Sequence, residues 1–364
     1  MERKITIYRG DEHRAKIERT FCKEDIFAEV YGKAYRIVDE IIKEMRNYQE
    51  ERMELGNYAE RYSGLGNNIL LFCGARGQGK TSAMQSFARC LNGKYAKEKL
   101  EGISVPKEME GVAFEVIDSI DPSAMENNES ILRVLLSRLF YQLEARVKKD
   151  SRMYREDEFI RQKKGIIDLF HKCYANIDYI KAKGAKDYEE DDLEKLSQLG
   201  SSAKLKDNLY GLIKIFLDMV IPDNGDKRGK YLVIPVDDAD LATKKVFCLC
   251  EDIRNYLSVP NVIVLMAVDY KQLVDATYQK YLKSYAVKRK AMPAKKDRYQ
   301  AANECYSMAA EYLEKVFPNG HRINLPQMDG LVAEGHENIQ FTYVLSTNKE
   351  GKQDKIAFGY ELSG

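Results

Sequence analysis

The sequence Gly74-Ala-Arg-Gly-Gln-Gly-Lys-Thr81 directly follows the apolar run Ile69–Cys73 and precedes a stretch of helical character that extends to Leu91. It fits the pattern Gly-x-x-x-x-Gly-Lys-Ser/Thr at every fixed position. Glycines let the backbone curl so that successive N–H groups converge on phosphate oxygens, and a helix N-terminus adds a favourable dipole. Placed between a strand and a helix, this stretch predicts a phosphate-binding loop in an α/β fold.

We expect this loop to bind ATP, or a close relative, together with Mg²⁺. Lys80 is expected to neutralise the β and γ phosphates and so to act in catalysis, and the Thr81 hydroxyl to ligate the metal. The expected nucleotide contacts come from the loop and the start of the helix: Gly74, Arg76, Gly77, Gln78, Gly79, Lys80, Thr81 and Ser82.

Hydrolysis requires a second acidic element, and the apolar run Leu232–Val236 ends in Asp237 and Asp238. We assign Asp237 to magnesium and Asp238 to the attacking water, which it would orient and deprotonate. The alternative is that both acids cap the helix that follows. If Asp238 is not the base, Asp240 is the next candidate.

Proline removes a hydrogen-bond donor from a strand ladder and seldom occupies a central strand. Pro235 lies two residues before Asp237. It leaves the register of the acidic strand open.

Asp269 follows the next apolar run, Asn261–Val268, where a polar side chain could sense the γ-phosphate from the adjacent strand. A plain cap between strand and helix would give the same pattern. Arg254 is the first candidate for a positive charge delivered to the transition state from a neighbouring subunit. Other arginines are possible donors, although each also suits a surface position: Arg133, Arg138 and Arg322.

Apolar runs alternate with segments of helical period along the chain, which predicts a parallel sheet flanked by helices. The expected strands after the loop are 111–118, 231–236, 261–268 and 321–326, and the expected helices are 131–147, 209–220, 243–257, 270–287 and 299–317.

Three segments are expected. Residues 1–60 form an N-terminal helical segment, with an amphipathic helix from Phe21 to about Met53. Residues 61–330 form the P-loop ATPase domain, and the charged stretch at about 148–220 is a solvated helical insertion in it. Residues 331–364 form a C-terminal β-hairpin, which is compatible with the start of a further domain.

Lys and Arg (58) nearly balance Asp and Glu (57), so net charge offers no long-range attraction to nucleic acid or to an acidic membrane.

The seven cysteines include no Cys-x-x-Cys pair. They are typical of reduced thiols in a cytoplasmic protein. No signal core or membrane-spanning apolar segment is found. We therefore expect a cytoplasmic protein without a membrane partner.

The P-loop, the Asp237-Asp238 strand, the strand Val262–Asp269 and the segment Tyr312–Phe317 with Leu325-Pro326 follow in this order. In this the chain resembles the AAA+/STAND branch of P-loop ATPases, and most of all the KAP-type group, over roughly residues 60–330. It departs from that group after Asp240, where the usual arginine is absent.

The resemblance implies an extra strand between the P-loop strand and the acidic strand, and often a ring or other homo-oligomer. It also implies a link to bacterial anti-phage defence, in which ATPases of the RADAR type work with an adenosine deaminase. A deaminase is then the expected partner.

The sequence leaves four functions in competition. The first is an ATPase whose hydrolysis changes its assembly or its partner. The second is a nucleotide-gated scaffold with little hydrolysis, against which the second acid of the Asp237-Asp238 pair argues. The third is a small-molecule phosphotransferase, against which the long spacing between Lys80 and Asp237 argues. The fourth is a nucleic-acid-associated AAA+ loader, which a neutral charge neither supports nor excludes.

Overall fold

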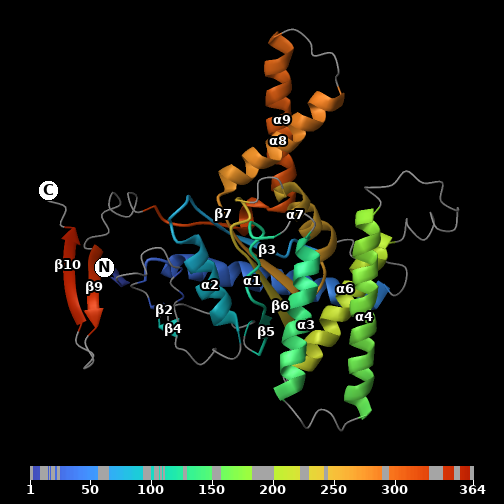
Figure 1. The fold of residues 1–364 in the computed structure, drawn as a ribbon. Coiled ribbons are helices and arrows are strands. Elements are labelled where there is room, and N and C mark those ends of the chain that lie inside the picture. The colour runs from blue at the N-terminus through green and yellow to red at the C-terminus, as the bar shows by residue number, and fades with distance from the viewer. Residues whose placement is uncertain are drawn as a thin grey trace.

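The central feature is a five-stranded, fully parallel sheet with the strand order β5-β6-β7-β3-β8 (Figure 1). This computed structural model describes residues 3–8, 15, 17, 21–22, 25–55, 65–92, 100–101, 106, 109, 111–125, 129–149, 157–182, 201–221, 229–241, 245–288, 295–327, 339–347 and 353–360. The five strands are β3 (Ile69–Cys73), β5 (Ala113–Val116), β6 (Lys230–Val236), β7 (Val262–Val268) and β8 (Arg322–Asn324).

Alternate side chains of the strands enter two separate cores, because successive residues of a strand point to opposite faces of the sheet. In β3, for example, Leu71 belongs to one core and Leu70 to the other. Both faces of β3, β6 and β7 are therefore buried, which explains why these strands are continuous apolar runs instead of alternating ones.

Helices cover both faces (Figure 1). One core is closed by α1 (Ala28–Leu55) and α2 (Lys80–Leu91). The other is closed by the remaining helices: α3 (Ile131–Lys149), α4 (Asp157–Ala182), α6 (Ser201–Val220), α7 (Val246–Asp252) with the π-helical turn η4 (Ile253–Leu257), α8 (Tyr270–Lys288) and α9 (Lys295–Val316). The expected parallel sheet flanked by helices is confirmed.

The strand β7 lies between the strand that precedes the loop, β3, and the acidic strand, β6. A parallel pair needs a crossover connection, and the segments between these strands supply helices for it. All strands of the sheet therefore end at one edge, where the loop and both acids also lie.

Pro235 occupies a central strand after all, and the neighbouring chain shows why this is possible. The amides of Ile117 and Ile120 donate to the carbonyls of Val233 and Pro235, at 3.2 and 2.8 Å. The two acceptor residues in β6, Val233 and Pro235, are two positions apart, whereas the two donor residues, Ile117 and Ile120, are three positions apart. The segment that follows β5 therefore has one extra residue beside the proline. A bulge of this kind is where a sheet tolerates a missing donor.

The stretch at about 148–220, which we expected to be a solvated insertion, also contributes to the hydrophobic core. Helix α4 packs on α6, and α6 packs on β6. Leu212, Ile213 and Phe216 of α6 are fully buried in the core of that face. The sequence predicted the apolar helix at Leu209–Val220, but it did not predict that α4 packs on this helix at the same core.

The first 60 residues are not purely helical. Helix α1 begins at Ala28, later than expected, because Phe21–Cys22 (β2) pairs in parallel with Leu100–Glu101 (β4). Arg3–Tyr8 (β1) is a further strand, which pairs in parallel with Ile339–Thr347 (β9).

The expected C-terminal hairpin is present, as β9 pairs antiparallel with β10 (Gln353–Tyr360). Together with β1 it forms a three-stranded sheet. The sequence did not predict this joining of the two ends of the chain.

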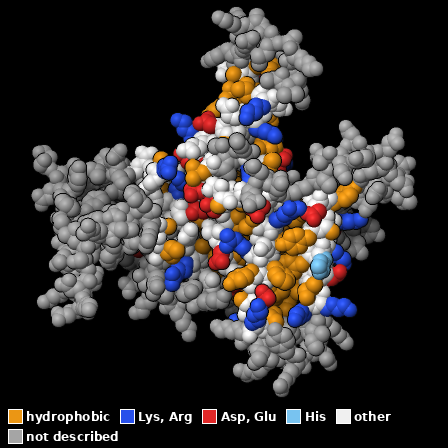
Figure 2. Space-filling view, in the orientation of Figure 1, with side chains coloured by type: hydrophobic (Ala, Val, Ile, Leu, Met, Phe, Trp, Pro, Cys, Tyr) orange, Lys and Arg blue, Asp and Glu red, His pale blue; other side chains and the backbone are white. Residues whose placement is uncertain are grey.

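The face seen in Figure 2 carries exposed apolar side chains over α3 and α4. Phe140 and Tyr141 of α3 are 46% and 68% exposed, and Ile167 of α4 is 36% exposed. None of the described helices is long and apolar enough to cross a membrane.

Candidate phosphate-binding site

The loop between β3 and α2 has the backbone of a phosphate cradle. Gly77 and Gly79 adopt positive φ angles of 84° and 82°, which side chains with a Cβ rarely adopt. The Gln78 side chain accepts a hydrogen bond of 2.7 Å from the Ala75 amide, and this closes the loop on itself. Arg76 is exposed at the outside of the turn.

The N-terminus of α2 is open to an anion. Its N-cap, Gly79, offers no side-chain hydrogen bond, and no acidic residue lies in the first turn. The first amides of a helix lack partners within the helix and carry the positive end of its dipole. Thr81 and Ser82 lie in this first turn, at the positive end of the helix dipole, which favours a phosphate.

Lys80 is folded inward. Its side chain is largely buried, with 8% of the residue exposed, and Nζ donates to the Ala75 carbonyl at 3.2 Å. The ammonium group is thus held against the loop that would carry the phosphates. Because a buried ammonium needs hydrogen-bond acceptors, phosphate oxygens placed in this loop would be suitable partners for it.

The acidic strand reaches the loop. The Thr81 hydroxyl donates a hydrogen bond of 2.9 Å to Oδ1 of Asp237, although the two residues are 156 positions apart. Asp237 is 9% exposed, and its Oδ1 also accepts from the Asp238 amide at 3.0 Å. The structure therefore brings the two predicted metal ligands into direct contact.

Burial raises the pKa of Asp237 above its ordinary value. The Thr81 hydrogen bond opposes that shift, and the nearby charges of Asp238 and Asp121 add to it. A divalent cation at this carboxylate would offset the cost of charging it, because it supplies the missing positive charge.

Asp238 is less buried and has a strained backbone. Its φ angle is 49°, in the left-handed region that is unusual for a residue other than glycine. Strain of this kind costs on the order of 1–3 kcal/mol and clusters at functional sites. The conformation turns the chain directly after Asp237, so the two acids do not continue as a strand.

Asp240 takes a larger part in the site than the sequence suggested. It is 3% exposed, and its Oδ1 has no hydrogen-bond partner among the described residues. Burial raises its pKa, while the backbone amides of Asp240 and Asp269 and the charge of Lys80 lower it. The sequence signal was only a third acid in the run from Asp237 to Asp240.

Asp269 is found as a helix cap. Its Oδ1 accepts from the backbone amides of Lys271 and Gln272, at 3.1 and 3.3 Å, and Oδ2 accepts from the Gln272 side chain at 3.3 Å. Both carboxylate oxygens thus serve the first turn of α8. Of the two interpretations of Asp269, the geometry favours the cap.

Three of the four candidate arginines form ion pairs with acidic side chains. Arg254 is exposed on η4, where its charge acts on Tyr281 and Tyr312. Arg133 pairs with Asp178, and Arg138 lies 3.6 Å from Asp118.

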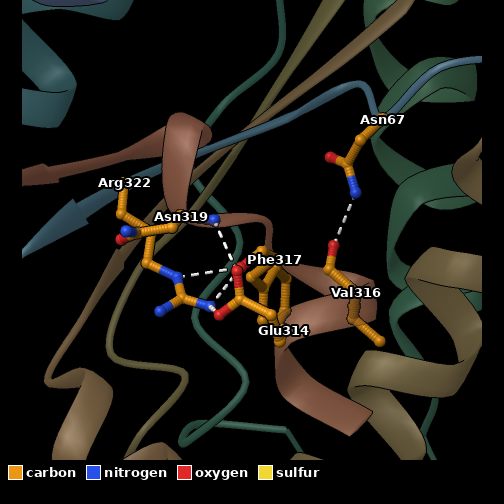
Figure 3. Close-up of polar contacts among 6 residues, drawn as sticks. All are labelled: Asn67, Glu314, Val316, Phe317, Asn319 and Arg322. Atoms are coloured by element: carbon orange, nitrogen blue, oxygen red, sulfur yellow. Dashed lines mark hydrogen bonds and ion pairs between the residues drawn. The ribbon is translucent and has the colours of Figure 1, made fainter. Parts of the chain in front are cut away.

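Arg322 binds the end of α9 (Figure 3): its guanidinium donates to the Phe317 carbonyl and to Glu314. The same guanidinium lies 3.9 Å from the centre of the Tyr270 ring. Glu314 in turn accepts from the Asn319 amide, while the Asn67 side chain donates to the Val316 carbonyl (Figure 3). These contacts give Arg322 a structural role at the base of α8 and α9.

The donor set at the edge of the sheet suits Mg²⁺. It consists of the Thr81 hydroxyl and the Asp237 carboxylate, and Mg²⁺ prefers one or two carboxylates with the remaining positions filled by water and substrate phosphates. The described residues hold no group of three His, Cys, Asp or Glu side chains that could bind a metal without a substrate.

A scan against models of known protein families finds no match, and no curated protein matches the chain in a sequence search. Arguments about function therefore depend on the geometry of the site.

Proposed function

We propose that the chain is a P-loop ATPase that binds ATP with Mg²⁺ and hydrolyses it. The hydrogen bond of 2.9 Å between Thr81 and Asp237 carries this proposal, because it joins the P-loop to an acid at the end of a different strand. A glycine turn in front of a helix has no need of such a partner, whereas a Mg²⁺–triphosphate site requires both groups.

The remaining residues fit the same chemistry. The amides at the start of α2 and the Lys80 ammonium would hold the β and γ phosphates, and Thr81 and Asp237 would hold Mg²⁺. Asp238, which lies next to Asp237 on a strained turn, is the proposed base for the attacking water. The bound Mg²⁺ would neutralise charge that develops on the phosphates.

The strand order supports an assignment to the AAA+/STAND branch, with the KAP-type group as the proposed family. Strand β7 lies between β3 and β6, as the resemblance implied. We further propose that hydrolysis is coupled to the assembly of several copies or to a partner protein. A role in anti-phage defence with a deaminase partner rests on the resemblance alone.

A nucleotide-gated scaffold is the second candidate. One observation favours it: Arg133, Arg138 and Arg322 form ion pairs with Asp178, Asp118 and Glu314. Without an arginine at the γ-phosphate, a single subunit would turn over slowly.

Binding is tested with Lys80→Ala, which removes the ammonium group from the loop. Charge-assisted hydrogen bonds contribute about 1.5–3 kcal/mol each, so the affinity for a fluorescent ATP analogue should fall about 10- to 150-fold. The matched control is Lys172→Ala on α4, whose ammonium is 55% exposed and pairs with Asp168. An unchanged affinity in a folded Lys80→Ala protein would refute the proposal.

Hydrolysis is tested with Asp238→Asn, by steady-state phosphate release measured beside the affinity for the fluorescent ATP analogue. The loss of a general base should slow turnover by about 10²- to 10⁴-fold while nucleotide affinity is kept. Wild-type protein that binds ATP tightly but shows no turnover above that of Asp238→Asn would favour the scaffold.

A further inference from the structure

Phe27 lies against the phosphate-binding loop, although it comes from the turn before α1. A Cβ atom added at Gly79 would lie 2.8 Å from Cζ and 3.2 Å from Cε2 of the Phe27 ring. The ring is therefore in contact with the backbone of the residue that begins α2. Sequence analysis did not select Phe27, because nothing in its surroundings marks it as part of a site.

The turn that carries Phe27 is held in place. The Ala28 amide donates to the Asp25 carbonyl at 3.0 Å, and the Tyr31 amide donates to the Phe27 carbonyl at 2.9 Å. The Phe27 ring also meets Tyr31 edge to face, with 6.4 Å between ring centroids. The ring position is thus defined by α1, independently of the loop.

Phe27 is less buried than the aromatic residues that follow it on the same helix. Tyr31 is fully buried and Tyr35 is 3% exposed, whereas Phe27 is only partly buried at the rim of the core. A phenyl ring that is partly open to solvent and fixed beside a helix N-terminus has a surface to offer to a ligand.

We propose that Phe27 stacks on the base of the bound nucleotide. This inference rests on the proposed function, since it requires phosphates in the loop. The ring lies against Gly79, in the loop that would hold the phosphates, so the base of the same nucleotide could stack on it. Every nucleobase has a π face, so the site would take a nucleoside triphosphate in preference to inorganic triphosphate, with little choice among bases from this contact.

The chain contains no tryptophan. The variant Phe27→Trp therefore carries a single indole fluorophore at the proposed stacking position. Its emission should be quenched on titration with Mg–ATP or Mg–GTP and should be much less affected by Mg–tripolyphosphate. The control is Phe140→Trp on α3, where the residue is 46% exposed and its ring meets Phe170 of α4. Its emission should not respond to any of these ligands.

The energetic test uses Phe27→Leu, which keeps an apolar side chain against Gly79 but removes the π face. Base–aromatic stacking of about 1–3 kcal/mol corresponds to about 5- to 150-fold in affinity. Affinity for Mg–ATP should fall by that factor, while affinity for Mg–tripolyphosphate should stay within about twofold. Melting temperature shows that the variant is folded.

Three results would overturn the inference. Equal losses for ATP and tripolyphosphate in Phe27→Leu would mean that the ring only supports the loop. An unquenched Phe27→Trp in the presence of saturating ATP would place the base elsewhere. Failure of wild-type protein to bind either ligand would refute the proposed function itself, and with it this inference.

Discussion

At the scale of single residues, the acids at the end of β6 have different surroundings although they are close in sequence. Asp237 bonds to Thr81, Asp238 lies on a strained turn, and Asp240 is almost fully buried beside Lys80. Burial without full hydrogen bonding makes a carboxylate costly to charge. The charged form of Asp240 therefore carries a cost in stability.

The raised pKa of Asp240 predicts whether removing its charge stabilises or destabilises the protein. Since it is raised in the folded state, folding favours the protonated form, and the charged form costs stability at neutral pH. Asp240→Asn should therefore increase the free energy of unfolding at pH 7. The gain should shrink as the pH falls towards the ordinary value of 3.8, where the wild-type carboxyl becomes protonated in both states. Urea unfolding at several pH values measures this.

The control for Asp240→Asn is Asp168→Asn on α4, whose side chain is 61% exposed and pairs with Lys172. It should change stability by less than about 1 kcal/mol at any pH. A loss of stability in Asp240→Asn at pH 7 would show that the attraction to Lys80 outweighs the cost of burial.

At the scale of elements, the ends of the sheet strands are tied to the helices by side chains that bind carbonyl groups. Asn68, at the start of β3, donates to the carbonyls of Leu257 and Val262, at 2.8 and 2.9 Å. His321 lies 3.0 Å from the Ile69 carbonyl. Helix C-termini and strand starts expose such carbonyls, and buried ones need a partner.

Arg322 is the strongest of these ties, and Arg322→Lys tests it. A lysine cannot donate to Phe317 through two nitrogens while it also binds Glu314, and it stacks less well on Tyr270. We expect the free energy of unfolding to fall by about 1–3 kcal/mol, measured by urea denaturation. Arg133→Lys, at an ion pair whose side chains are 35% and 61% exposed, should cost less than about 1 kcal/mol. Equal effects of the two substitutions would contradict a special role for Arg322.

At the scale of the whole molecule, the site is built from both faces of the sheet. The loop and α2 belong to the core that α1 closes, whereas β6 leads into α7 and η4 on the opposite face. Helices α8 and α9 extend from the body as a hairpin (Figure 1). Arg254 lies on η4, where it is exposed.

Assembly is tested by the dependence of activity on protein concentration. If a neighbouring subunit supplies the transition-state charge, ATPase activity per chain should rise as subunits associate, since an arginine from another subunit contributes about 10³- to 10⁵-fold. A mixture of Lys80→Ala and Arg254→Ala chains should recover activity that neither has alone. Flat activity per chain across a dilution series, with size followed by light scattering, would mean that each subunit works independently.

Local patterns determined much of this protein from the sequence alone. Gly77 and Gly79 are needed where φ is positive, and apolar runs mark strands that are buried on both faces. The glycine pattern and the apolar runs each depend on residues that are close together in the chain. The loop, the parallel sheet and the acids at a strand end could therefore be predicted.

Only the tertiary structure decided which distant residues meet. It brought Thr81 to Asp237, placed Phe27 on Gly79, buried Asp240 near Lys80 and set a bulge beside Pro235. It also joined β1 to the C-terminal hairpin. These contacts depend on the order of the strands and on the helices that pack on each face of the sheet. That arrangement results from apolar burial summed over the whole chain, so no single position in the sequence predicts it.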